Sequence, residues 1–388
     1  MAKDDDAIIF EERAAGGGRV VAFARLNAER ALNSLSKAMI DALQPRLEAW
    51  AQRDDVACVV LFGSGDKAFC AGGDVIGLYQ AMRAADGAPS AEAEGFFAAE
   101  YRLDHTIHRF PKPVLCWGHG IVMGGGLGIM AGASHRVVTE ASRIAMPEVT
   151  IGLFPDVGAS WFLGRMPARI GLFLGLTTTP MKAGDALWLN MGDYLLESAM
   201  RDAVFDALTE IDWQATRADN DSLLADALRR FEDTDSAASL CEQSALFARQ
   251  RAIAALTDAP DVQTFIDRLQ AAADTDEFFA HGAKAIANAS PLSLAVVHRQ
   301  LARDPRLSIE QVLQQDYASA VACTRRPDLA EGIRALLVDK DKQPSWTPAR
   351  LAEVTDAQVS AHFALPADYE GRHPLADLRE SMIESRGD

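Results

Sequence analysis

The sequence predicts an α/β protein, in which a layered core of strands and helices is followed by an all-helical region. Three observations support this prediction. The chain has 388 residues, of which 49% are hydrophobic and 24% charged, a composition typical of globular proteins with room for two domains. Strand-like runs and helical patterns alternate over about the first 200 residues. After about residue 195 only helical periodicity continues, so we expect one unit at residues 1–200 and another at residues 201–388.

The expected strands of the core are β-rich runs that end at glycine or turn residues. In chain order they are Arg19–Leu26, Val56–Phe62, Pro113–Trp117 and His135–Thr139. A glycine-rich helix start lies between the last two runs. Strands that alternate with helices in this way predict helices layered on a sheet.

A helix is expected between the first two strands. Ser34 and Ser36 are suitable N-cap residues, and a polar turn at Gln52–Asp55 follows the last apolar position. Pro45 lies inside the pattern, where proline tends to kink a helix. The apolar residues at helical spacing are Met39, Ile40, Leu43, Leu47 and Trp50.

The charge balance excludes several classes of partner. The chain has 38 basic and 55 acidic residues, a net charge of −17, which disfavours nonspecific attraction to nucleic acid or to anionic lipid. The longest small or apolar run, residues 121–133, contains five glycines and is too short to span a membrane. We therefore expect no nucleic-acid or membrane partner, and an anionic ligand would need a local cluster of donors.

The expected location is cytoplasmic. Five cysteines, an odd number without metal-ligand spacing, fit a reducing compartment. The acidic start of the chain has neither the charge order of a secretory signal nor the Arg and Ser bias of a transit peptide. His105 and His108 have an i, i+3 spacing but no second cluster of ligands, so no metal site is expected.

The first candidate site segment is Phe69–Asp74, which precedes an amphipathic helix. Its paired glycines, Gly72 and Gly73, permit positive φ angles or a close approach of the backbone to a ligand. Asp74 is placed to cap the following helix. The segment is therefore either a tight strand-to-helix turn or a place where a ligand meets bare amide groups.

The second candidate segment is Gly118–Gly128, with four glycines among its last five residues, at a helix start. A glycine costs a helix about 1 kcal/mol relative to alanine, so this composition requires a compensating role. The N–H groups at a helix N-terminus bind anions or a developing oxyanion, and glycine lets a ligand approach them. The alternative is that the glycines allow close packing of the helix.

The same stretch matches the dinucleotide-binding fingerprint at Gly126-x-Gly128-x-x-Ala131, with Glu148 about 20 residues further on. The match gives an alternative function, a nicotinamide-dependent dehydrogenase. Its position disfavours that function, because the fingerprint belongs directly after the first strand of a βαβ unit and two expected strands come earlier.

Three acidic residues lie in apolar surroundings. Glu148 and Asp156 are eight residues apart in otherwise apolar sequence. Burial raises the pKa of a carboxyl group, which suits it to general acid or base catalysis. The alternatives are helix caps or a satisfied buried pair. Glu100 follows Phe96 and Phe97 on one helix, and by its own pattern it would be a surface residue.

Taken together, these segments resemble the crotonase (enoyl-CoA hydratase/isomerase) superfamily. The likeness rests on Lys67–Asp74, Gly120–Gly126 and the stretch from Met146 to Asp156, and the region from about 200 to 320 contributes little. It implies a spiral of ββα units followed by helices, and a coenzyme A thioester as substrate. Within the superfamily the sequence is most similar to the hydrolase branch that cleaves 3-hydroxyisobutyryl-CoA, which implies a part in valine breakdown.

The resemblance also implies roles for individual residues. The N–H groups of Gly73 and Gly125 would form an oxyanion hole for the thioester oxygen. Glu148 would activate water or attack the carbonyl carbon, and Asp156 would position the substrate hydroxyl and assist proton transfer to the thiolate. Further substrate contacts are implied for Glu100, Gly72, Gly124, Arg30, Ala31, Ala71 and Asp74. No metal or other cofactor is implied, since coenzyme A is part of the substrate. Relatives often form trimers, so a homo-oligomer is one expectation. The alternative is that the long helical C-terminal region covers that surface instead.

The sequence departs from the hydratase pattern at one position. Hydratases of the superfamily usually have a second catalytic glutamate two residues beyond the glycine triplet, where this chain has Gly128. The departure favours thioester hydrolysis over addition of water to a double bond. Two alternatives stay open, an enoyl-CoA hydratase or isomerase on the same fold and an acyl-CoA-binding protein without turnover.

Overall fold

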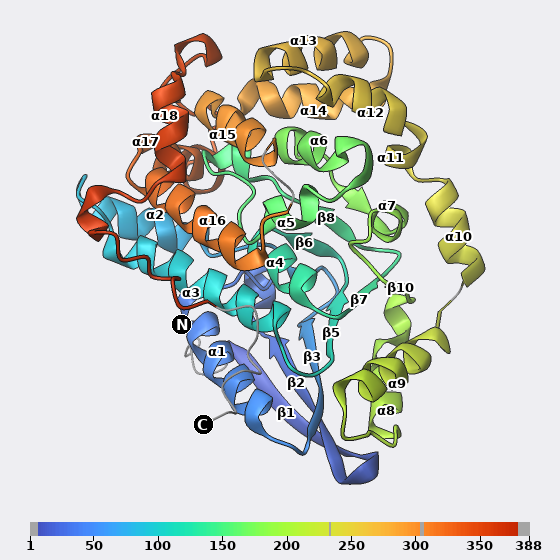
Figure 1. Ribbon diagram of the computed structural model, residues 1–388. Coiled ribbons are helices and arrows are strands. Elements are labelled where there is room, and N and C mark those ends of the chain that lie inside the picture. Colours follow the sequence, from blue (N-terminus) through green and yellow to red (C-terminus); the bar gives the residue numbers. More distant parts are fainter. Residues whose placement is uncertain (1–6, 233, 303–305, 379–388) are drawn as a thin grey trace.

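The computed structural model describes residues 7–232, 234–302 and 306–378, and its strands form two sheets (Figure 1). The larger sheet has six strands in the order β1-β2-β3-β5-β7-β10. β1 runs antiparallel to β2, and every other neighbouring pair in this sheet is parallel. The strands are β1 (Ile8–Ala15), β2 (Arg19–Leu26), β3 (Val56–Gly63), β5 (Val114–Gly118), β7 (His135–Val138) and β10 (Tyr194–Leu195).

The smaller sheet holds the strands that lead into the glycine-rich segments. Its order is β4-β6-β8-β9, with β8 and β9 antiparallel and the other pairs parallel. The chain supplies one strand to the larger sheet, the next to the smaller sheet, and then a helix, and it repeats this path. The predicted spiral of ββα units is confirmed. The strands are β4 (Ala68–Cys70), β6 (Ile121–Met123), β8 (Arg143–Ala145) and β9 (Met181–Lys182).

The helices of the first half begin and end near the expected positions. In α1 the Ser36 hydroxyl accepts a hydrogen bond from the Met39 N–H, and the helix continues through Pro45 without a break. All five predicted apolar positions of α1 are buried. The helices are α1 (Lys37–Gln52), α2 (Val75–Ala84), α3 (Ala91–His108), α4 (Gly125–Gly132), α5 (Ala159–Leu163), α6 (Ile170–Thr177) and α7 (Ala183–Trp188).

The sequence patterns do not predict β1. Only Ile8 of its eight residues is buried, because β1 lies at the edge of the larger sheet. The strand lacks the alternation of apolar and polar residues on which strand prediction depends. Its pairing with β2 is what makes it a strand.

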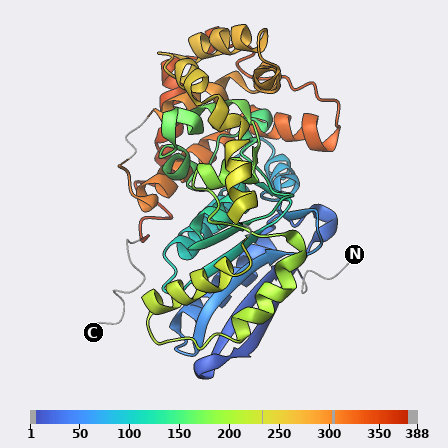
Figure 2. The same cartoon turned by 90° about the vertical axis from the view of Figure 1, so that its right-hand side faces the viewer.

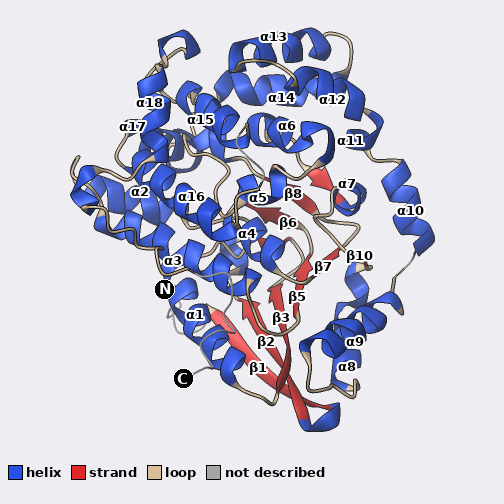
Figure 3. Cartoon of the chain, in the orientation of Figure 1, coloured by secondary structure: helices blue, strands red, loops and turns tan. Residues whose placement is uncertain are grey.

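Beyond β10 the described residues form helices and loops, as the periodicity predicts (Figure 3). None of the described helices combines the length and apolar character that crossing a lipid bilayer requires. The helices are α8 (Arg201–Thr209), α9 (Arg217–Arg229), α10 (Thr234–Glu242), α11 (Ala245–Ala248), α12 (Gln250–Thr257), α13 (Val262–Ala273), α14 (Glu277–Asn288), α15 (Pro291–Leu301), α16 (Ile309–Thr324), α17 (Pro327–Ile333) and α18 (Asp356–Ser360).

The hydrophobic core has two parts, one on each face of the larger sheet. Figure 2 shows α8 and α9 lying along one face, where Phe205 and Leu228 pack against strand residues such as Phe23. The main cluster lies on the other face and includes side chains from Ile8 to Leu378. Its members therefore come from both sides of the boundary that we expect near residue 200.

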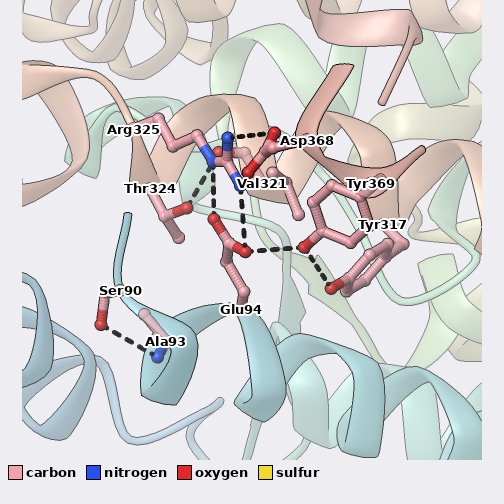
Figure 4. Close-up of polar contacts among 9 residues, drawn as sticks. All are labelled: Ser90, Ala93, Glu94, Tyr317, Val321, Thr324, Arg325, Asp368 and Tyr369. Atoms are coloured by element: carbon pink, nitrogen blue, oxygen red, sulfur yellow. Dashed lines mark hydrogen bonds and ion pairs between the residues drawn. The ribbon is translucent and has the colours of Figure 1, made fainter. Parts of the chain in front are cut away.

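A network of polar contacts ties the C-terminal segment to α3 (Figure 4). Arg325, which directly follows α16, donates a hydrogen bond to Glu94 of α3 at 2.7 Å and another to Asp368 at 2.9 Å. The Tyr369 hydroxyl donates to the second oxygen of Glu94 at 2.6 Å and contacts the Tyr317 hydroxyl at 2.8 Å. We call these five residues the C-terminal clasp. It joins the helix that carries Glu100 to elements more than 200 residues further along the chain.

Candidate active site

A cavity of about 200 Å³ lies where both glycine-rich segments meet the acidic residues. Apolar side chains of α2, α3 and the π-helical segment Arg334–Val338 form part of its wall. Its lining residues are Ala71, Gly72, Gly73, Val75, Leu78, Phe96, Phe97, Glu100, Gly124, Gly125, Pro147, Glu148, Thr150, Ile151, Leu153, Asp156, Leu336 and Leu337.

The first glycine segment reaches the cavity from β4. Gly72 has a φ of +114°, which glycine adopts without strain. The Leu35 N–H donates to the Gly72 carbonyl at 2.8 Å, and the Asp74 N–H donates to the Leu35 carbonyl at 2.9 Å. These two bonds hold Gly73 between them. Among the described residues, the Gly73 N–H donates no backbone hydrogen bond outside the regular helices and strands.

The second glycine segment reaches the cavity from β6. Gly124 has a φ of +48° and turns the chain into α4, which starts at Gly125. The first N–H groups of an α-helix have no partner within the helix, so the Gly125 N–H is available to a ligand. The Gly73 nitrogen lies 3.4 Å from the position that a Cβ atom would take on Gly125. The structure therefore brings the two predicted amide groups to the same place.

Three carboxyl groups surround these amides. Glu148 follows Pro147 at the start of a short 3₁₀ helix, and its Oε1 lies 3.0 Å from the position of a Cβ on Gly124. Asp156 accepts a hydrogen bond from the Tyr101 hydroxyl at 2.7 Å. Glu100 points from α3 to the same place, since its Oε1 would touch a Cβ on either Gly73 or Gly125.

Burial controls the protonation of these acids. Glu148, Asp156 and Glu100 are only 5%, 4% and 2% exposed. Burial, and then repulsion from the Asp156 carboxylate, raise the pKa of both Glu100 and Glu148 well above the usual range. Burial also raises the pKa of Asp156 to about 6, although the hydrogen bond from Tyr101 opposes the shift. These are the raised pKa values that the apolar sequence predicts for Glu148 and Asp156.

The expectation that Glu100 is a surface residue by its own pattern is wrong. Its neighbours on α3 are large aromatic residues that pack in the core, and α3 is covered by α1, α2 and α16. Covering a helix on several sides buries its polar residues together with the apolar ones. The resemblance implies that Glu100 contacts the substrate, and a contact inside the cavity requires this buried position.

Three predicted contact residues lie outside the cavity. Arg30 and Ala31 are exposed on a 3₁₀ turn that is joined to Ala71 by the hydrogen bond from the Ala71 N–H to the Leu32 carbonyl, at 3.0 Å. Asp74 caps α2 by accepting a hydrogen bond from the Gly77 N–H at 3.0 Å, as its sequence position predicts. Ala71, Gly72 and Gly124 do line the cavity. Contacts of Arg30, Ala31 and Asp74 with coenzyme A stay predictions.

Sequence reasoning missed two buried acids beneath the cavity, Asp104 and Asp316. Asp104 is four residues after Glu100 on α3, so helical spacing alone places both on one face and could have revealed it. Asp316 comes from α16, where it accepts hydrogen bonds from the Gly158 N–H at 2.9 Å and from Gln300 at 3.1 Å. No local pattern connects Asp316 with the site.

A larger cavity of about 340 Å³ lies at the other end of α4, lined by Ala131–Ala133 and by several basic side chains. These cations already have partners within the protein. Arg136 forms an ion pair with Asp193 at 2.6 Å, and Arg165 donates to the Trp161 carbonyl at 2.7 Å. Among the residues that the structure describes, no carboxyl group lines this cavity. The smaller cavity is therefore the candidate active site.

The fold and the site together define a class of protein, an α/β spiral in which bare amide groups from two glycine segments face buried carboxyl groups. The chain belongs to the enoyl-CoA hydratase/isomerase family, whose sequence profile matches residues 21–363. The crotonase superfamily that the sequence predicts is confirmed. Membership in this family contradicts the dehydrogenase alternative, and the fingerprint match lies inside α4.

Some similar proteins are named hydrolases, and others are named hydratases or dehydratases. The 3-hydroxyisobutyryl-CoA hydrolase of Homo sapiens, named as mitochondrial, is 34% identical over 366 residues, which make up 94% of this chain and 90% of the human protein. A crystal structure of a carnitinyl-CoA dehydratase from Mycobacterium thermoresistibile has a TM-score of 0.80 and 35% identity, covering 93% of this chain and 97% of that one. An enoyl-CoA hydratase from Rhodobacter sphaeroides 2.4.1 has a TM-score of 0.77 and 31% identity, covering 93% and 98%.

Proposed function

We propose that this chain is an acyl-CoA thioester hydrolase that converts 3-hydroxyisobutyryl-CoA to the free acid and coenzyme A. The observation that carries the proposal is the meeting of the Gly73 and Gly125 backbones with the buried Glu148 carboxyl group in one cavity. The printed names of the curated relatives support the choice of substrate. A part in valine breakdown belongs to the same proposal.

The two amides would bind the thioester oxygen. When water or Glu148 attacks the carbonyl carbon, negative charge develops on that oxygen, and the N–H groups of Gly73 and Gly125 stabilise it as hydrogen-bond donors. The Gly125 amide also lies at the positive end of the α4 dipole, which acts in the same direction. Groups of this kind lower the barrier because they are in place before the charge appears.

Glu148 would supply the attacking oxygen by one of two routes. As a general base it takes a proton from water while the water oxygen bonds to the carbonyl carbon. As a nucleophile it forms an acyl anhydride that water then cleaves. In both routes the C–S bond breaks and the thiolate of coenzyme A leaves. The Glu148 Oε2 has no hydrogen-bond partner within the described residues, so it is free to act on water or substrate.

Asp156 would protonate the leaving group, and Glu100 would bind the substrate hydroxyl group. A pKa of about 6 lets Asp156 exchange protons near neutral pH, so it can donate one to the departing thiolate. Glu100 lies beside both amides and would bond the 3-hydroxyl group. An acyl chain without a hydroxyl group would leave the buried Glu100 carboxyl group without a hydrogen-bond partner. The site would therefore select strongly against such acyl chains.

Water addition to an enoyl-CoA is the second candidate function, because the two solved structures named above are described as a dehydratase and a hydratase. The surroundings of Gly128 disfavour it. A Cβ atom on Gly128 would lie 2.6 Å from the Val157 Cβ and 2.9 Å from an Asp104 oxygen. A second catalytic glutamate at position 128 therefore has no room.

The test is release of free thiol from a panel of esters by purified protein. We expect release from 3-hydroxyisobutyryl-CoA and at least tenfold less from isobutyryl-CoA, which lacks the hydroxyl group. Glu148→Gln should lower kcat by roughly 10²–10⁴ and leave binding of coenzyme A, measured by calorimetry, unchanged. Hydration of crotonyl-CoA without thiol release would falsify the proposal in favour of the hydratase. Acyl-CoA binding without turnover by the wild type would identify a binding protein.

Location and assembly stay proposals. The cytoplasmic location that the sequence predicts is not confirmed, since the curated vertebrate relatives are named as mitochondrial proteins. We propose a small-molecule thioester as the main partner, consistent with the family. A homo-oligomer remains an expectation, which sedimentation of the purified protein would test.

A further inference from the structure

Asp104 is a buried acid that the proposed chemistry does not use. It lies on the same face of α3 as Glu100, one helical turn further on, and is 4% exposed. Neither of its carboxyl oxygens has a hydrogen-bond partner within the described part of the chain. Since nearly all buried polar side chains in proteins have partners, an unpartnered carboxyl group beside a reaction site requires an explanation.

Asp104 packs against the first turn of α4. Its Oδ1 lies 2.9 Å from the position that a Cβ atom would take on Gly128. The Gly128 N–H donates to the Gly124 carbonyl at 3.1 Å, so this is the turn that presents the Gly125 amide to the cavity. A negative charge on Asp104 would therefore oppose the positive helix end that faces the thioester oxygen.

The surroundings of Asp104 favour its neutral form. Burial, and then repulsion from three carboxyl groups, raise its pKa well above the usual range. No titratable residue comes from α4. The basic side chains that follow on α3 are His105, which contacts Glu310 of α16, and His108, whose ring packs edge-on against Trp161. Arg109, directly after α3, also contacts Glu310. The titratable groups that face Asp104 are Glu100 of α3, Asp156 in the loop before α5, Asp316 of α16 and the Cys70 thiol of β4.

We propose that Asp104 is a positioning residue for the oxyanion hole. As a neutral acid it leaves the positive end of α4 available to the thioester oxygen, and as an anion it weakens that stabilisation. Loss of the Asp104 proton then sets the alkaline limit of the reaction. The inference rests on the thioester hydrolysis proposed above.

The test compares the pH dependence of kcat and KM for thiol release in wild type and two variants of Asp104. Asp104→Asn is neutral at every pH and has nearly the same shape, and Asp104→Val has no polar atoms at all. We expect near wild-type kcat at neutral pH and an alkaline limb shifted upward by at least one pH unit. Two pH units above the wild-type midpoint, both variants should then keep about tenfold more of their kcat. KM should change little.

Asp185→Asn is the matched control. Asp185 is equally buried, but its carboxylate accepts hydrogen bonds from the Ser244 hydroxyl at 2.5 Å and from the Lys182 N–H at 2.9 Å, and it does not line the cavity. We expect its alkaline limb to stay where the wild type has it. An unshifted limb in a folded Asp104 variant, or a hundredfold loss of kcat at neutral pH, would overturn the inference.

A second readout needs no activity. A raised pKa means that folded protein binds the proton more tightly than the unfolded chain, so wild type loses stability as pH rises from about 4 toward the folded pKa. Asp104→Asn escapes this loss, and its Tm advantage over wild type should grow with pH. A Tm difference that stays constant contradicts the neutral state of Asp104. A growing difference without any thiol release would instead show that the proposed function, and with it the positioning role, is wrong.

Discussion

At Gly125 we expect even one added methyl group to lower the activity strongly. A Cβ atom there would collide with the Glu100 carboxyl oxygen, beside the Gly73 amide. We expect Gly125→Ala to lower kcat/KM by roughly 10²–10³, because it disturbs one donor of the oxyanion hole. The measurement is thiol release, with circular dichroism to show that the variant is folded.

Gly95→Ala is the control for this prediction. Gly95 lies in the interior of α3, and a Cβ atom there would meet nothing within 4 Å. An alanine should leave kcat/KM unchanged and raise the free energy of unfolding by about 0.4–1 kcal/mol. If both glycine variants lost activity equally, the loss would come from a general disturbance of the helices and not from the Gly125 N–H donor.

Asp156 should link stability to pH. Because burial raises its folded pKa to about 6, ionisation destabilises the folded state progressively as pH rises from about 4, the unfolded value, to about 6, and the penalty is constant above that. Asp156→Asn keeps an acceptor for the Tyr101 hydroxyl and avoids the charge. We expect it to be more stable than wild type at pH 7 by on the order of 2–3 kcal/mol, and less active.

Urea unfolding of wild type and Asp156→Asn at several pH values measures this difference. The advantage of the variant should increase through the acidic window and then level off. A difference that shrinks with rising pH would mean that the native site favours the charged form of Asp156.

Local sequence was informative about the acids only where they stood out from their neighbours. Glu148 and Asp156 are isolated acids in apolar sequence, which predicts burial. For Asp104 the local signal is its spacing of four residues from Glu100 on α3, whereas nothing local distinguishes Asp316 from a surface acid. The number of elements packed around a helix decides which of its polar residues are buried.

At the scale of elements, α3 has two tasks. It carries Glu100 and Asp104 toward the site, and its first turns carry Glu94 into the C-terminal clasp (Figure 4). The Glu94 side chain is only 10% exposed, so loss of its cationic partner leaves a largely buried carboxylate. The clasp therefore fixes the position of α3 relative to α16.

We expect Arg325→Met to lower the free energy of unfolding by about 2–3 kcal/mol, because it removes charge-assisted hydrogen bonds to Glu94. Arg229→Met is the matched control, since Arg229 and Asp226 form an ion pair with side chains more than 60% exposed. The control should change stability by less than about 0.5 kcal/mol. Equal losses in the two variants, measured by urea unfolding, would contradict a structural role for the clasp.

Elements with strong periodicity were predicted well. β2 has the expected bounds, Arg19–Leu26, and α1 buries the expected face because apolar side chains at helical spacing must find a core. β4, β6, β8 and β9 have only two or three residues each, too few for a period to appear. Their pairing with one another, which depends on distant segments, makes them strands.

At the scale of the molecule, the two expected units share one core. Gly332 of α17 approaches the Ile151 backbone so closely that a Cβ atom would lie 2.4 Å from its carbonyl carbon. Asp316 of α16 bonds the Gly158 N–H, and Gln300 of α15 donates to the Pro155 carbonyl at 2.9 Å. The loop that holds Glu148 and Asp156 is therefore supported by helices of the second half.

We expect a fragment of residues 1–200 to be insoluble or largely unfolded when expressed alone, because it would expose the faces that α8, α9 and α15–α17 cover. The full chain, prepared in parallel, is the control. Circular dichroism and a cooperative thermal transition provide the measurement. A fragment that unfolds cooperatively and binds coenzyme A would show that the two units are independent domains.

The sequence by itself determined the superfamily, the ββα spiral, the helical second half and the segments that meet in the cavity. The superfamily and the spiral are what the resemblance of the glycine-rich and acidic segments implied. The helical second half and the candidate segments themselves depend on local properties: apolar periodicity, the conformational freedom of glycine and acids placed among apolar residues. Tertiary structure decided that Glu100 is buried, that Asp104 and Asp316 lie beneath the site, and that the second half supports the acidic loop. Burial and electrostatic repulsion depend on every element packed around a group, and that information is spread along the whole chain.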